Sequence, residues 1–410
     1  MKRTHEWAQH FIPEEEIPEP EGINNNQSKD TLSKSVEQCS PQFIENVIPL
    51  SKYSFETHPV TTEDGYVLSL FRLRSKTARQ NGKVVFLQHG LQNCAGSWLQ
   101  NGEDKALGFL LAKAGFDVWL GNNRGSKYSR KNLKLSPNDR DFWHFSFDQM
   151  AQYDVPANLK YVNQATDSQI IYIGYSQGTT QMFAALSDAK IRPKVAPLIK
   201  VFYALAPIVY LDQNKVPVTN YVTYLTNLVK TLAYAVGVDY LNLGTCVWDQ
   251  AKVDYWNKYC GDSPKKCYKK VFLTDQDPSV DNWPRDGYRE LIGSAGASAQ
   301  SFLHYAQLIK AQIKNSHAFP KYDYGAIKNY AKYGQLTPPN YDLGLVRERV
   351  RLWVGTKDTL GTVPEIERIH QDLKNADSDI QMLTNWGHAT FNLAKDASYF
   401  YQLVDELKSL

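Results

Sequence analysis

Hydrophobic positions along this chain gather into short apolar runs, and the segments between them carry the spacing of amphipathic helices. A short apolar run of this kind is typical of a strand that is buried on both faces. The predicted strands lie at 83–90, 116–123, 170–173, 199–208, 350–358 and 379–388. The helical segments among them include 108–115, 147–163 and a stretch that begins at Gln177. Strands of this type separated by helices form parallel sheets covered on both faces, so the pattern predicts an α/β fold with a mostly parallel sheet.

Two extended segments with alternating polarity precede this series, within 58–73. The dipeptide Asp64-Gly65 separates them, and Asp-Gly is a favoured sequence for a tight turn between antiparallel strands. The sequence therefore predicts a β-hairpin in front of the parallel strands.

The alternation of strands and helices stops over 209–330, where 218–241 places apolar side chains on one helical face. This interval predicts an inserted helical cap between two parts of one core, 41–208 and 331–410. The periodicity alone is equally compatible with an ordinary core helix. Residues 1–40 are rich in Pro, Glu, Asn and Ser, which predicts a flexible polar tail.

Composition removes several classes of function. Among 410 residues, 46 Lys and Arg oppose 43 Asp and Glu, so there is no basic excess of the kind that nucleic-acid binding requires. No apolar run is long enough for a transmembrane segment, and the N-terminus lacks the apolar stretch of a signal peptide. The five cysteines lack zinc-site spacing, whereas Cys260 and Cys267 flank a turn-rich loop and either form a disulfide or remain free thiols.

The segment Gly174-Tyr175-Ser176-Gln177-Gly178 follows a predicted strand and precedes a predicted helix. It matches G-x-S-x-G, the sharp turn that presents a nucleophilic serine at the edge of an α/β-hydrolase sheet. Gly174 and Gly178 leave room for the strained backbone beside the serine. The context predicts that Ser176 is a nucleophile and not a turn residue.

A nucleophilic serine needs a histidine base and an acidic residue that orients it, in the chain order Ser, Asp or Glu, His. Asp358 and His388 each come directly after a predicted strand, in that order. His370 lies inside an amphipathic helical segment, and His317 has no strand before it. The predicted triad is therefore Ser176, Asp358 and His388.

The oxyanion of the tetrahedral intermediate requires two fixed N–H donors. The residue after the nucleophile supplies one in this fold, and the loop after an early strand supplies the other. The backbone N–H groups of Gln177 and Leu91 occupy these positions in the sequence. We expect His89, next to this loop, to shape the backbone and not to take part in catalysis.

Long blocks of the sequence resemble the acid lipases, the family that includes gastric and lysosomal acid lipases. They include "VTTEDGYVLSLFRL", "FLQHGLQNCAGSW", "LAKAGFDVWLGNNRGSKYSRKN", "FWHFSFDQMAQYDVPANLKYV" and "YIGYSQGTTQMFAAL". The similarity extends over 43–210 and 319–400, and across the predicted cap it rests mainly on 293–310.

The resemblance implies an α/β-hydrolase fold and hydrolysis of neutral lipid esters, triacylglycerols or steryl esters, at a lipid–water interface. It implies neither a metal nor an organic cofactor. It suggests a secreted or lysosomal protein, but no apolar leader supports this address, and a cytosolic or lipid-droplet-associated protein is the alternative. Two positions depart from the family pattern. Tyr175 replaces a usual histidine before the nucleophile, and Thr390 replaces an aspartate two residues after the predicted catalytic histidine.

Two other functions remain compatible with the sequence. One is a non-catalytic lipid-binding protein on a hydrolase scaffold, which a serine-reactive fluorophosphonate probe would not label. The other is a soluble esterase for short acyl chains, which a panel of esters of different chain length distinguishes from a lipase.

Overall fold

The computed structural model describes residues 48–215 and 295–410, together with 44, 240–241, 277, 279–285 and 293. The predicted tail 1–40 and most of the predicted cap lie outside the described residues, and so do Cys260 and Cys267. No helix in the described part of the chain combines the length and the apolar character that crossing a membrane requires.

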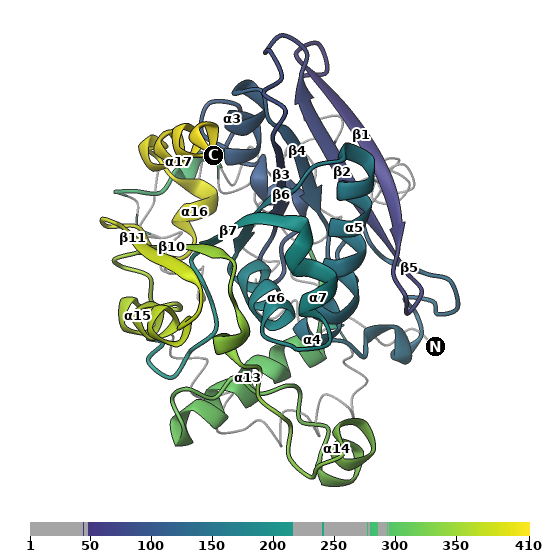
Figure 1. The fold of residues 1–410 in the computed structure, drawn as a ribbon. Helices are drawn as coiled ribbons and strands as arrows, with labels where there is room; N and C mark the ends of the chain where they lie inside the picture. Colours follow the sequence, from purple (N-terminus) through teal and green to yellow (C-terminus); the bar gives the residue numbers. More distant parts are fainter. Residues whose placement is uncertain are drawn as a thin grey trace, which may run out of the picture.

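A nine-stranded sheet forms the centre of the molecule (Figure 1). Its strands are β1 (Tyr53–Thr61), β2 (Tyr66–Ser75), β3 (Val84–Gln88), β4 (Asp117–Gly121), β5 (Lys131–Asn132), β6 (Ile170–Tyr175), β7 (Ile199–Leu205), β10 (Arg349–Gly355) and β11 (Asp377–Leu383). The spatial order is β1-β2-β4-β3-β6-β7-β10-β11, and β5 pairs with β2. The pairs from β4 to β11 are parallel, whereas β1 with β2 and β2 with β4 are antiparallel. The expected mostly parallel sheet and the hairpin at Asp64-Gly65 are both confirmed.

Helices cover both faces of this sheet. The helices in the described part of the chain are α3 (Leu107–Lys113), α4 (Phe147–Gln149), α5 (Val155–Thr166), α6 (Gln177–Leu186), α7 (Arg192–Val195), α13 (Ala299–Lys314), α14 (Ala326–Tyr333), α15 (Val363–Asp372), α16 (Thr390–Leu393) and α17 (Ser398–Ser409). Of these, α14 contributes no residue to the cores that flank the sheet. A short two-stranded sheet pairs β8 (Tyr240–Leu241) with β9 (Ala297–Ser298). In Figure 1, α13 and α14 lie together at the lower end of the molecule.

Alternate side chains of each central strand enter two different cores. On β3, Val85 and Leu87 point into the core that α3, α16 and α17 close, whereas Val84 and Phe86 point into the core under α4 to α7, α13 and α15. This two-residue period is that of an extended strand. It explains why β3 reads as an uninterrupted apolar run, since both faces of the strand are buried.

Two predicted elements differ in detail from the sequence-based interpretation. The last strand, β11, lies at the edge of the sheet, and most of its side chains are partly or fully exposed, including Met382 at 43%. In the described part of the chain it pairs with β10 alone. Because most of its side chains are exposed, the prediction of a strand buried on both faces is wrong there. The helix predicted over 147–163 is divided into α4, a π-helical turn at Met150–Asp154, and α5, which has Pro156 in its first turn.

The parallel arrangement explains where the candidate residues gather. Parallel strands have their carboxyl ends at one edge of the sheet, and ligands of such folds bind beyond that edge. The loops that leave β3, β6, β10 and β11 at this edge carry His89, Ser176, Asp358 and His388, respectively.

Candidate active site

Ser176 occupies the turn between β6 and α6 with a backbone conformation that is unusual for an L-residue. Its φ is 53° and its ψ is −119°, and the close approach of neighbouring backbone holds it in this strained state. A Cβ on Gly174 would lie 2.7 Å from the carbonyl carbon of Gly178. A Cβ on Gly178 would lie 2.2 Å from the carbonyl oxygen of Gln88. Only glycine fits at either position, so these two residues permit the sharp turn that projects the serine.

Ser176, His388 and Asp358 form a continuous hydrogen-bonded chain. His388 Nε2 lies 2.9 Å from Ser176 Oγ, and His388 Nδ1 lies 2.9 Å from Asp358 Oδ2. The buried carboxylate fixes the tautomer, because an acceptor facing Nδ1 keeps the proton on that nitrogen. Nε2 is then left as an acceptor for the serine hydroxyl.

Asp358 is held rigidly by its own loop. Its second oxygen, Oδ1, accepts hydrogen bonds from the backbone N–H groups of Leu360 and Gly361, both at 2.8 Å. The neighbouring loop that carries His388 packs directly on the end of β10, where a Cβ on Gly355 would lie 2.1 Å from the carbonyl oxygen of Trp386. Backbone contacts therefore help to position both the acid and the loop that carries the histidine.

The loop after β3 lies against the serine. A Cβ on Gly90 would approach within 3.0 Å of Ser176 Cβ, so this glycine lets the loop come close to the turn. Within the described part of the chain, no acceptor is bonded to the backbone N–H of Leu91 or to that of Gln177. The two predicted donor N–H groups therefore have no other acceptor among the described residues. One lies on the loop after β3 and the other at the start of α6, and these two segments meet at Ser176.

His89 has its side chain buried and fully used in hydrogen bonds. Its Nδ1–H donates to the carbonyl oxygen of Gly90 at 2.8 Å, and its Nε2 accepts from the backbone N–H of Asn123 at 3.0 Å. Both bonds fit the neutral imidazole, and burial lowers the pKa of His89 to about 4. This geometry supports the expected role of His89 in shaping the loop.

Because His89 is buried and neutral, we expect the folded protein to lose stability against unfolding in acid. The unfolded side chain takes up a proton near its ordinary pKa of about 6.5, whereas the folded one resists protonation until about pH 4. Stability is therefore lost as pH falls through this window, by on the order of 3 kcal/mol from this group. We expect His89→Asn to be less stable than the wild type at pH 7 but to lose less stability by pH 4. Denaturant unfolding of both proteins across this range measures the difference, and parallel pH curves would contradict the assignment.

The two competing histidines lie away from this chain of hydrogen bonds. His370 is exposed on α15 and has Nδ1 2.9 Å from Ser378 Oγ. His317 is exposed and bonds Asp372 at 2.7 Å. Among the described residues, no group of three or more His, Cys, Asp or Glu side chains is arranged to hold a metal ion.

Comparisons with known proteins decide the family. Residues 44–102 match the model of a partial α/β-hydrolase lipase region, and residues 83–231 match the model of the α/β-hydrolase fold. Human lipase member K is 34% identical over 366 residues, covering 86% of this chain and 87% of its own. Rat gastric triacylglycerol lipase is 35% identical over 370 residues, covering 86% and 88%. Human lysosomal acid lipase/cholesteryl ester hydrolase is 31% identical over 369 residues, covering 87% and 88%.

The chain belongs to the acid lipase family. Membership makes the protein a lipase-type hydrolase, a class that cleaves carboxylic esters of lipids. The fold agrees with solved structures of lower similarity. A soluble variant of monoglyceride lipase from Saccharomyces cerevisiae matches with a TM-score of 0.50 at 17% identity, covering 86% of this chain and 94% of the other.

The two departures from the acid lipase pattern both contact the loop that carries His388. The Tyr175 hydroxyl donates to the carbonyl oxygen of His388 at 3.0 Å, and the two rings lie 5.3 Å apart. Thr390 Oγ1 accepts from the backbone N–H of Gly387 at 3.0 Å. Sequence reasoning singled out these positions only as substitutions, because neither contact leaves a pattern in the chain.

Proposed function

We propose that Ser176, His388 and Asp358 act as a catalytic triad that hydrolyses neutral lipid esters through an acyl-enzyme. The observation that carries this proposal is the pair of 2.9 Å contacts that link the serine hydroxyl to the imidazole and the imidazole to the buried carboxylate. A serine hydroxyl is a weak nucleophile until a positioned base removes its proton, and this arrangement provides that base.

In the acylation step, Ser176 Oγ attacks the ester carbonyl while His388 Nε2 takes its proton. The imidazolium then gives this proton to the departing alcohol oxygen, which leaves the acyl group on the serine. Water attacks the acyl-enzyme in the second step, with His388 again as the base, and releases the fatty acid. Asp358 holds Nδ1–H throughout and stabilises the positive charge that forms on the ring.

The negative oxygen that develops on the ester carbonyl is bound by the N–H groups of Leu91 and Gln177. Gln177 is the first residue of α6, so its N–H also lies at the positive end of the helix dipole. Removing one such donor from an oxyanion hole costs about 3 kcal/mol of transition-state stabilisation.

The substrate class follows from the relatives and not from the triad, which would cleave any accessible ester. Two relatives are named as a triacylglycerol lipase and a cholesteryl ester hydrolase, and both names denote esters of neutral lipids. We assign triacylglycerols or steryl esters to this protein on that basis. No metal or organic cofactor takes part in the proposed steps.

A panel of esters tests the substrate assignment. We expect fatty acid release from emulsified triolein or cholesteryl oleate to exceed turnover of tributyrin held below its solubility limit, because a neutral lipid is presented as an aggregate. Titration of released acid measures all three, with the Ser176→Ala protein as the blank. Activity confined to dissolved tributyrin would favour a short-chain esterase. Absence of turnover on the whole panel would favour a lipid-binding protein.

A further inference from the structure

Residues 320–340 leave the body of the molecule and return to it as one closed loop. The backbone N–H of Tyr341 donates to the carbonyl oxygen of Phe319 at 2.8 Å, and that of Lys321 donates to Pro339 at 2.9 Å. The two ends of the loop are therefore paired like two short strands. Helix α14 forms the outer part of the loop, at the lower end of Figure 1.

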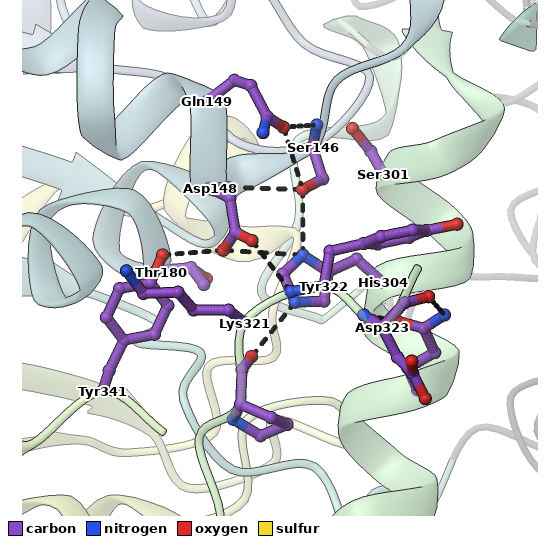
Figure 2. Close-up of polar contacts among 12 residues, drawn as sticks. Ser146, Asp148, Gln149, Thr180, Ser301, His304, Lys321, Tyr322, Asp323 and Tyr341 are labelled. Carbon is purple, nitrogen blue, oxygen red and sulfur yellow. Dashed lines mark hydrogen bonds and ion pairs between the residues drawn. The ribbon is translucent and has the colours of Figure 1, made fainter. Parts of the chain in front are cut away.

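A buried carboxylate fixes both ends of this loop to the core (Figure 2). Asp148, in the short helix α4, accepts the backbone N–H of Tyr322 at 2.8 Å on Oδ2 and the hydroxyl of Tyr341 at 2.7 Å on Oδ1. His304 of α13 lies beside it, bonded to Ser146 Oγ at 3.0 Å. A loop fastened at both ends in this way holds α14 in a defined orientation.

The polarity of α14 is the reverse of that of an ordinary surface helix, which buries its apolar side chains. All eight residues of α14 are described, and Asn329 is the one that is buried. Its side-chain amide donates to Asp323 at 2.7 Å and to the carbonyl oxygen of Leu336 at 3.0 Å. By contrast, Ile327 is 87% exposed, Tyr330 65%, and Leu336, just beyond the helix, 63%. The helix is thus attached through a polar residue and presents apolar side chains to the surroundings.

Beyond Asp323, which lies near the base of the loop and bonds Asn329, the charged side chains of the loop are all lysines. Residues 324–341 contain no aspartate or glutamate, whereas Lys328 and Lys332 lie one helical turn apart on α14. The Lys332 ammonium rests 4.3 Å from the centre of the Tyr324 ring and bonds its hydroxyl at 2.9 Å. In the described part of the chain Lys328 has no ion-pair partner, so α14 offers apolar side chains flanked by positive charge.

The base of the loop also connects α14 to the candidate active site. Gln149 of α4 donates to the hydroxyl of Tyr324, which immediately precedes Gly325 at the start of the helix, at 3.3 Å. Met150, which follows α4 as the first residue of the π-helical turn, accepts from the side chain of Gln177 at 3.4 Å. Gln177 directly follows Ser176. Few contacts therefore separate the exposed helix from the catalytic turn.

We propose that α14 and Leu336 dock the protein on a lipid–water interface that carries anionic headgroups. Apolar side chains flanked by lysines are the arrangement with which helices lie in such an interface, where the apolar groups enter the acyl boundary and the ammonium groups stay among the headgroups. The proposal rests on the proposed function, because a hydrolase of aggregated esters has to work at a lipid surface. It identifies the element that contacts this surface.

Vesicle binding tests the docking role in the full-length Ser176→Ala protein, so that the measurement is independent of turnover. We expect Ile327→Ser combined with Tyr330→Ser to lower co-sedimentation with phosphatidylcholine vesicles containing phosphatidylserine by about tenfold or more, since two apolar anchors are lost. Lys328→Glu combined with Lys332→Glu should abolish the preference for these vesicles over pure phosphatidylcholine. Leu133→Ser is the matched control, because Leu133 is also 65% exposed but lies beyond β5. This control should bind as the parent does.

The same substitutions in the active protein separate this proposal from the proposed function. Hydrolysis of a dissolved short-chain ester should stay unchanged in every variant, while hydrolysis of an emulsion should fall in the α14 variants alone. Unchanged vesicle binding by the Ile327/Tyr330 variant, or an equal loss in Leu133→Ser, would overturn the docking role. A parent protein that binds neither vesicle type and instead self-associates through α14 would also overturn the docking role. Intact vesicle binding without any ester turnover would contradict the proposed function and leave the docking role standing.

Discussion

Replacing Ser176 with alanine is expected to lower ester turnover by about 10⁴–10⁶-fold while the fold stays intact. The change removes the attacking oxygen and leaves the general base without a proton to take. Removal of one oxygen atom from a turn that backbone contacts already fix creates little strain. The melting temperature should therefore remain close to that of the wild type, and initial rates on emulsified and dissolved esters measure the loss.

Residual activity of the alanine protein decides whether Ser176 is the nucleophile. The strained φ of 53° at this residue is maintained by the packing of Gly174 and Gly178, which the substitution does not touch. A rate as high as a tenth of the wild-type value, in a protein that melts normally, would show that another group attacks the ester.

His388→Ala is expected to be nearly as severe as the serine substitution, and Asp358→Asn to lower turnover by about 10⁴-fold. The alanine removes the base outright. The asparagine keeps the size of the side chain but can present an N–H to Nδ1, which favours the wrong tautomer, and it cannot stabilise the imidazolium. Single-turnover acylation rates with a dissolved ester measure both effects without interference from binding to an interface.

His370→Ala serves as the matched control for the histidine substitution. His370 is an exposed side chain on α15 whose Nδ1 bonds Ser378, so its loss should leave acylation unchanged. If His370→Ala were the crippling change and His388→Ala were tolerated, the assignment of the base would be wrong.

The sequence predicted the parts of the fold that follow from local patterns. Asp64-Gly65 between alternating segments forms the turn between β1 and β2, and the apolar run after Lys83 forms β3 with both faces buried. The edge position of β11 did not follow, because pairing is a property of the sheet and the run "DIQML" does not reveal that one of its two neighbours is missing.

The sequence likewise predicted one part of the candidate site and not the other. Ser176, Asp358 and His388 each follow a strand, and once parallel strands share a carboxyl edge their meeting is a geometric consequence that chain order predicts. The contacts of Tyr175 with His388 and of Thr390 with Gly387 join a side chain to a backbone group, which no spacing rule encodes. The anchoring of both loop ends on Asp148 likewise depends on segments 174 and 193 residues away in the chain.

Fluorophosphonate labelling followed by peptide mapping shows whether this chain is a serine hydrolase with Ser176 as its nucleophile. The reagent forms a covalent bond only with a serine that a neighbouring base activates, and it does not require the natural substrate. We expect a single phosphonylated peptide that contains Ser176, no label in Ser176→Ala, and strongly slowed labelling in His388→Ala. An unlabelled wild-type protein, or a label on another serine that persists in Ser176→Ala, would contradict this expectation.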